Sequence, residues 1–146
     1  MTRDIKAMLD RVVDEVFDDD FVIVNLSSDD PARSSSVQVS SPSYESRQAV
    51  IRVDPVWVEG FIPELNVQTA LLVDDYGDED DDELEADREA ELMKLCRVMR
   101  AYLQGGGQVT MRRRMFGRGS TFVLKIEVDG FEWRLGQNYW AGPKPV

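Results

Sequence analysis

Hydrophobic residues recur every three or four positions in two segments of this chain, which is the spacing of one buried helix face. In residues 3–17 the recurring residues are Ile5, Met8, Leu9, Val12, Val13, Val16 and Phe17. In the second segment, which begins near Glu83, they are Leu92, Leu95, Cys96, Met99, Tyr102 and Leu103. We predict an amphipathic helix in each segment, and we expect the glycines at 105–107 to end the second one.

Apolar and polar residues alternate in the C-terminal third, which predicts half-buried strands. The dipeptide Asp129-Gly130 separates two such strands and is a strong signal for a two-residue hairpin turn. The apolar pairs that this turn puts on one face are Val128 with Phe131, Ile126 with Trp133 and Leu124 with Leu135. A third strand before this hairpin completes a predicted three-stranded meander.

The segment between the two helices predicts further strands. The candidates are Phe21–Leu26, Val37–Ser40, Gln48–Val53 and Val67–Val73. The first is nearly all apolar, as in a strand buried on both faces, so we expect it at the centre of a sheet. Residues 54–66 contain Pro55 and Pro63, and we expect a buried irregular connection or a short strand there.

This order of elements predicts an α+β fold. Its parts are an N-terminal helix, a mainly antiparallel sheet, a second long helix and a C-terminal three-stranded β-meander. The 146 residues have the length of one domain, spanning 1–146. We expect an acidic loop at about 74–82 and a partly irregular tail at 136–146, whose Tyr139 and Trp140 pack back on the domain.

Composition predicts a cytoplasmic protein that does not enter membranes. The 42% apolar and 31% charged residues are typical of a soluble globular chain. No stretch approaches the roughly 18 apolar residues of a membrane span. The N-terminus lacks the basic and continuously apolar parts of a signal peptide. The single cysteine, Cys96, suits a reducing compartment, and we expect it to be a buried structural thiol.

Charge is divided unevenly along the chain. Residues 1–91 carry 7 Lys and Arg against 25 Asp and Glu, a net charge of −18. Residues 92–146 carry 10 against 3, a net charge of +7, which brings the total to −11. A strongly acidic protein repels nucleic acid and anionic membranes and attracts basic partners, so this balance favours a basic protein partner.

The chain contains no histidine, which excludes much of side-chain catalysis. Ser-His-Asp and Cys-His mechanisms and histidine-based metal sites are ruled out. Carboxylates, lysine and tyrosine remain as acid–base groups, but no pattern among them marks a catalytic site. The acidic run does not match a calcium-binding loop, because Glu83 stands where the turn of that loop requires glycine. We expect no enzyme activity, no metal and no cofactor.

Acidic residues are the first candidates for a partner-binding site. They are Asp18, Asp19, Asp20, Asp74, Asp75, Asp78, Glu79, Asp80, Asp81 and Asp82. The first three follow a predicted helix, at the end where the helix dipole disfavours negative charge. Such departures from a local rule are enriched at functional positions. A hydrophilic turn between a helix and a buried strand explains them better, because an exposed charge at a helix end costs little.

A basic face on the meander is the alternative binding site. A tight turn at Gly117-Arg118 would pair Met111 with Leu124 and Val109 with Ile126 on the apolar side. The basic residues on the polar side and at this turn are Arg112, Arg114, Arg118, Lys125 and Arg134.

Two features of the hairpin bear on what this basic face could bind. Lys125 stands opposite Arg134, and a diagonal contact of Lys125 with Glu132 would offset part of their repulsion. The aromatic residues that could stack on bases are expected on the core side instead: Phe122, Phe131 and Trp133. Nucleic acid is therefore disfavoured as a partner.

The function expected from these observations is protein binding without catalysis. The most concrete version is an immunity- or antitoxin-type inhibitor that masks a basic site on a toxin or secreted effector. A secretion-type chaperone that binds an effector segment by adding a strand is the first alternative. A nucleic-acid-binding module and a carboxylate- or metal-dependent enzyme are the others, and a homodimer also fits the charge pattern.

Overall fold

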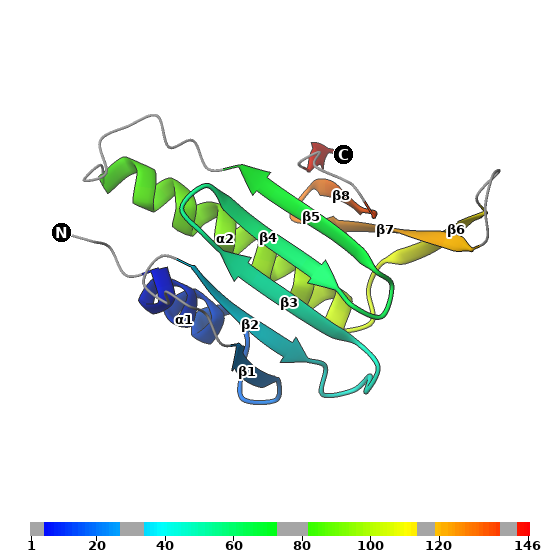
Figure 1. The fold of residues 1–146 in the computed structure, drawn as a ribbon, viewed down its shortest axis with the longest axis horizontal. Coiled ribbons are helices and arrows are strands. Elements are labelled where there is room, and N and C mark those ends of the chain that lie inside the picture. Colours follow the sequence, from blue (N-terminus) through cyan, green and yellow to red (C-terminus); the bar gives the residue numbers. More distant parts are fainter. Residues whose placement is uncertain (1–4, 27–33, 73–81, 114–118, 138–142) are drawn as a thin grey trace.

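The computed structural model describes residues 5–26, 34–72, 82–113, 119–137 and 143–146. The fold is α+β, as predicted, and consists of two helices and two antiparallel sheets (Figure 1). The elements are α1 (Ile5–Val16), β1 (Val22–Leu26), β2 (Ser35–Ser40), β3 (Gln48–Val53), β4 (Trp57–Ile62), β5 (Val67–Leu72), α2 (Asp82–Leu103), β6 (Gln108–Arg113), β7 (Ser120–Val128), β8 (Phe131–Leu135) and β9 (Lys144–Pro145).

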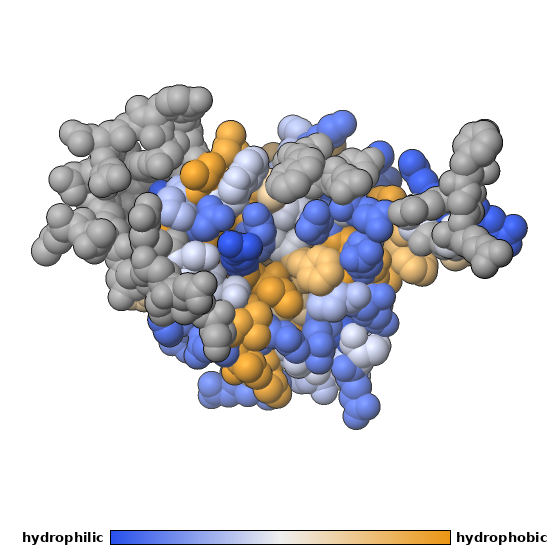
Figure 2. All heavy atoms as spheres, viewed as in Figure 1, coloured by the Kyte–Doolittle hydropathy of each residue, from blue (hydrophilic) through white to orange (hydrophobic). Residues whose placement is uncertain are grey.

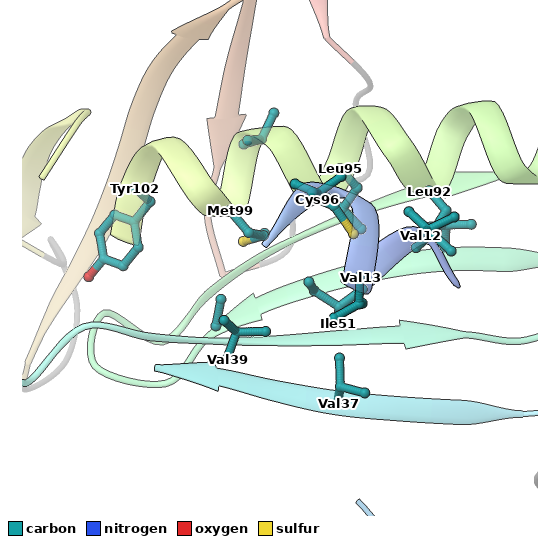
Figure 3. Packing of buried hydrophobic residues seen from close by; sticks show 14 of the residues in the cluster. Val12, Val13, Val37, Val39, Ile51, Leu92, Leu95, Cys96, Met99 and Tyr102 are labelled. Carbon is teal, nitrogen blue, oxygen red and sulfur yellow. The ribbon is translucent and has the colours of Figure 1, made fainter. Parts of the chain in front are cut away.

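The first sheet contains β1 to β5 in chain order, and both helices cover the same face of it. Side chains of α1 and α2 meet the inward-facing residues of β2 and β3 (Figure 3). The second sheet has the order β6-β7-β8-β9, and its strand β7 packs against α2. Helix α2 therefore lies between two sheets, which explains why Val98, outside the predicted apolar stripe, is buried as well.

Both predicted helices are confirmed, and each buries the predicted face. All the apolar residues of the first stripe and all those of the second are buried. Among the described residues, neither helix combines the length and the apolar composition that crossing a bilayer requires.

Helix α2 packs closely against β4 at Gly60. A Cβ atom at Gly60 would collide with Met99 Cε and would lie 3.0 Å from Leu95 Cδ1. The absence of a side chain at this position therefore lets the helix lie directly on the strand.

The C-terminal end of α2 is held by the turn between β2 and β3. Gly105, with φ of 97°, turns the chain out of the helix, and the amide of Gly106 donates to the carbonyl of Ala101 at 2.9 Å. Ser41 Oγ donates to the carbonyl of Leu103 at 2.5 Å, and Arg47 Nη1 donates to the carbonyl of Tyr102 at 2.8 Å. Carbonyls that a helix end leaves without intrahelical partners are thus satisfied by the sheet.

The predicted hairpin at Asp129-Gly130 is confirmed in its register and its turn. Strands β7 and β8 pair Val128 with Phe131, Ile126 with Trp133 and Leu124 with Leu135. Asp129 has φ of 54° and Gly130 has φ of 83°. Two successive positive φ values are those of the turn type that matches the twist of a hairpin.

The predicted pairing of the third strand is wrong by two residues. Strand β6 pairs Val109 with Leu124 and Met111 with Phe122, whereas a tight turn at Gly117-Arg118 required Ile126 and Leu124 as their partners. A shift of two keeps the same side chains on each face, so the prediction of the face is right and the prediction of the turn is not. The turn itself lies outside the described residues.

The position predicted for the first strand is also wrong. Among the described residues, strand β1 pairs only with β2 and stands at the edge of its sheet. Its residues are exposed except Leu26, which is half-buried. A continuous apolar run is typical of a strand with both faces covered, but here neither helix reaches beyond β2 far enough to cover β1. The position of β1 outside both helices therefore leaves it exposed, although its residues are apolar.

Residues 54–66 contain a regular strand, which confirms the second of the two alternatives. Strand β4 lies between β3 and β5, and the two prolines stand outside it. Pro55 lies in a turn where Asp54 Oδ1 accepts hydrogen bonds from the amides of Val56 and Trp57. Neither proline therefore removes an amide from the strand ladder.

Candidate protein-interaction surface

The free edge of β1 is the most unusual feature of the described surface. Val22, Ile23 and Val24 are 59%, 37% and 50% exposed in a strand that pairs on one side only. The register with β2 places Val22 and Val24 on the uncovered face of the sheet and Ile23 on the helix side. Exposed apolar edge strands bind other strands readily, and natural proteins usually block them with charge, proline or a bulge.

The uncovered face of the first sheet continues this apolar surface. Successive pairings place Val24, Gln38, Val50, Phe61 and Gln68 side by side across the five strands. Figure 2 views this face and shows apolar residues running from β1 to the centre of the sheet. Among the described residues, no helix packs on this side.

A hollow of about 320 Å³ lies on this face between β3 and β4. The residues that line it are Val50, Arg52, Glu59, Gly60, Phe61 and Gln68. Its floor is apolar, and the register sets Arg52 directly opposite Glu59. The hollow is shallow and open, so it suits a side chain of a bound protein better than a small molecule, which needs a deeper cavity.

The acidic residues Asp18, Asp19 and Asp20 connect α1 to β1, and all three are exposed. Asp18 Oδ1 accepts a hydrogen bond from the amide of Asp20 at 3.1 Å, and the carbonyl of Asp18 accepts one from the amide of Phe21 at 3.2 Å. These bonds form the turn that brings the chain from the helix into the strand. Asp18 therefore has a structural role in the turn, because it accepts both bonds. The three negative charges therefore stand directly before the free edge of β1.

The other acidic candidates are not brought together with these three by any described contact. Six of them lie outside the described residues: Asp74, Asp75, Asp78, Glu79, Asp80 and Asp81. Asp82 is the first residue of α2. Among the described residues, no three acidic or cysteine side chains are close enough to hold a metal ion.

The basic face of the meander is partly neutralised by its own sheet. Lys125 Nζ lies 2.8 Å from Glu132 Oε1, as expected from the diagonal, and Arg134 Nε lies 3.4 Å from Glu132 Oε2. The hydrogen bond from Lys125 is the main cause that lowers the pKa of Glu132. Arg112 is exposed on β6, on the same face, whereas Arg114 and Arg118 lie outside the described residues.

The aromatic residues of this sheet have mixed positions. Trp133 is buried, and Phe122 packs against the core as expected. Phe131 shares their face, but at the end of the hairpin it is exposed, so the expectation that it is covered is wrong.

Strand β6 forms a second free edge. Within the described part of the chain it pairs only with β7, every one of its residues is exposed, and the β6–β7 hairpin projects from the body (Figure 1). Val109 and Met111 lie on one face and are 46% and 55% exposed. Arg112 and Arg113 end the strand. The predicted apolar face is thus correct for this strand, but the core does not extend far enough to cover it.

The other edges are shorter or partly covered. The amide of Gln68 on β5 donates to the carbonyl of Gly136 at 2.9 Å, and this isolated bridge joins the two sheets. Strand β9 has only two residues. Among the described strands, β1 and β6 therefore present the longest unpaired edges.

The acidic and basic halves of the chain do not neutralise each other through the described ion pairs. Arg11 binds Glu89 within the acidic half, and Arg97 binds Asp129 within the basic half. Among these residues the division is crossed only by Lys94 and Glu91, which are neighbours on α2. Among the described residues, the charge asymmetry of the sequence is therefore not removed by ion pairs between the two halves.

Buried Tyr102 forms a polar cluster with exposed Glu64 and half-buried Arg47 at the end of α2. Its hydroxyl donates to Glu64 Oε2 at 3.0 Å, and its ring lies 4.6 Å from the guanidinium carbon of Arg47. Burial, followed by the hydrogen bond to Glu64, raises the pKa of Tyr102 to about 12 from its ordinary value of 10. The folded protein thus favours the neutral phenol.

Alkaline pH is therefore expected to destabilise the fold through Tyr102. The stability contributed by the neutral phenol is complete below pH 10, the pKa of an unfolded tyrosine, and is lost as the pH rises through about 12. In an absorbance titration, Tyr102→Phe should remove an ionisation near pH 12 and reduce the loss of stability in this range. Tyr44→Phe, which removes an exposed phenol, should retain that ionisation, and its loss in the Tyr44 variant instead would contradict the assignment.

Cys96 is a buried residue of α2, as predicted for a structural thiol (Figure 3). Burial raises its pKa, so the reactive thiolate is suppressed in the folded protein.

Comparison of the chain with protein-family models, with curated proteins and with solved structures gave no match. The sequence predicted the acidic residues before β1 and basic residues of β6 as candidates, but it did not predict that both strands have an unpaired edge. The unbroken apolar run at 21–24 predicts a strand, but it does not indicate whether another strand pairs with its second edge.

Proposed function

We propose that this protein is a small cytoplasmic protein-binding domain without catalytic activity, which binds an extended basic segment of its partner along the edge of β1. In its most concrete form it is an immunity- or antitoxin-type inhibitor that masks a basic site on a toxin or secreted effector. The observation that carries the proposal is the apolar free edge of β1, directly preceded by Asp18, Asp19 and Asp20.

Strand addition supplies both affinity and selectivity at such an edge. The unpaired amides and carbonyls of β1 would bind any extended backbone. Val22 and Val24 favour apolar side chains at alternate positions of the added strand, and the three aspartates favour positive charge at one end of it. The net charge of −11 speeds the encounter with a basic partner. The same geometry suits a secretion-type chaperone, which binds an effector segment by adding a strand.

A designed peptide tests this proposal directly. The probe is a capped, fluorescently labelled peptide that alternates valine and threonine and ends in two lysines. Its binding to the full chain is measured by fluorescence anisotropy. Val24→Lys places a like charge on the edge and should weaken binding by about tenfold or more. Replacing the two lysines of the peptide with glutamates should also weaken binding.

Leu72→Lys is the matched control, because Leu72 is an exposed apolar residue of the same sheet on β5, away from the free edge. This variant should bind the peptide as the wild type does. Equal binding to the Val24 and Leu72 variants would exclude β1 as the site, and no binding to any of the proteins would overturn the proposal.

A further inference from the structure

Strand β6 has the chemistry that the free edge of β1 is proposed to bind. It carries apolar residues at alternate positions, Val109 and Met111, and it ends in Arg112 and Arg113. It is itself a free edge and is exposed on both faces. Within one molecule it belongs to the other sheet and lies apart from β1 (Figure 1). A second copy of the chain would bring the two strands together.

We infer that the β1 edge of one copy binds the β6 edge of another, so that the protein assembles head to tail through antiparallel strand pairing. This inference rests on the proposed function, because it identifies the partner of the β1 edge as a second copy of the chain. A basic partner and a second copy would then compete for β1.

One register of this pairing satisfies both the apolar and the charged positions. The facing pairs are Val22 with Met111, Ile23 with Thr110, Val24 with Val109 and Asn25 with Gln108. Directly opposed residues lie on the same face, so the apolar face of β6 continues the uncovered apolar face of the first sheet. The turn of Asp18, Asp19 and Asp20 that precedes β1 then lies at the same end of the pairing as Arg113.

Other registers lose this agreement. A slip by one residue moves Val22 and Val24 onto the face of Thr110 and Arg112, so that apolar residues oppose polar ones. A slip by two residues keeps the faces but leaves only one apolar pair, either Val22 with Val109 or Val24 with Met111. The agreement of faces and apolar pairs therefore selects one alignment.

Charge also selects pairing between unlike edges over pairing between like edges. Two copies of β1 paired antiparallel would set each acidic flank beside the uncharged Asn25–Leu26 end of the other strand. Two copies of β6 would likewise set each pair of arginines beside the uncharged Gln108 end, so neither arrangement brings opposite charges together. Pairing β1 with β6 instead opposes the acidic half of one copy, with a net charge of −18, to the basic half of the next, with +7. Since each copy keeps one free edge of each kind, such an assembly continues beyond a dimer unless it closes into a ring.

Two single variants, each blocking one edge, separate these arrangements. Val24→Lys blocks β1 and leaves β6 available, whereas Met111→Lys blocks β6 and leaves β1 available. Both residues are about half exposed, so neither substitution should disturb the core, and circular dichroism melting checks this. Mass is measured by size-exclusion chromatography with light scattering, from micromolar to submillimolar protein concentrations.

The wild type is expected to grow in mass beyond the dimer as concentration rises, and to shrink as salt is added. Each variant alone should stay monomeric, and an equimolar mixture of the two should form a dimer and nothing larger. A wild type that stays monomeric overturns the inference. So does a dimer that persists in Met111→Lys, which indicates pairing of β1 with β1, or one that persists in Val24→Lys, which indicates pairing of β6 with β6.

The same variants keep this inference distinct from the proposed function. Met111→Lys retains a free β1 edge and should bind the valine–threonine–lysine peptide. If it binds the peptide but does not associate with Val24→Lys, the head-to-tail assembly is excluded and the proposed function stands. If it binds neither, both are overturned.

Discussion

Replacing Leu95 with alanine is expected to lower the free energy of unfolding by about 3 kcal/mol, within the range for deletion of a fully buried leucine side chain. Leu95 is completely buried on α2 (Figure 3), and its side chain packs against Gly60 of β4. A second sheet packs against α2, so the helix cannot move inward to fill the cavity without disturbing the packing of β7.

Denaturant unfolding followed by far-ultraviolet circular dichroism measures this loss. Leu72→Ala is the matched control, because Leu72 is 61% exposed and its replacement should change the stability by no more than about 0.5 kcal/mol. Equal losses in the two variants would contradict the packing of α2 described above.

The second large effect is expected at Trp133, where alanine should lower the free energy of unfolding by about 3–5 kcal/mol. Trp133 is buried on β8 and belongs to the same apolar cluster as the residues between α2 and the first sheet. Removing its side chain opens a large cavity on the side of the core that the second sheet covers. Because the cluster is continuous, the whole chain should unfold in a single transition at a lower denaturant concentration.

Phe131→Ala is the control for this experiment, since Phe131 is an exposed aromatic residue on the same strand and should contribute about 1 kcal/mol or less. Two separate transitions in Trp133→Ala, one of them unchanged from the wild type, would show that the second sheet unfolds independently of the first. That result would exclude a common core.

The elements predicted correctly are those whose signals are local. Helix α1 buries the expected stripe because the spacing of its apolar residues leaves a single face to bury. The Asp129-Gly130 hairpin has the expected register because the turn type itself fixes which residues face each other. The ion pair between Lys125 and Glu132 follows from that register and was predicted with it.

The incorrect predictions depend on contacts between distant parts of the chain. An apolar run such as 21–26 predicts a strand but not its place in the sheet. Whether such a strand is central or at the edge depends on where the helices and the other strands lie. The register of β6 depends on a longer connection that no short motif specified. For the candidate site, the sequence identified the charges at Asp18–Asp20 and Arg112, but not that each charge stands beside an unpaired edge.

By itself, the amino-acid sequence determined the α+β class, the two helix faces, the C-terminal hairpin and the division of charge, since each of these follows from residue spacing, turn chemistry or a count of charged groups. Only the tertiary structure decided which strands became edges and which apolar residues stayed in contact with solvent. The physical reason is that the burial of a side chain depends on which elements pack against it. Val24 and Val37 are equally apolar, but of the two only Val37 is covered by a helix.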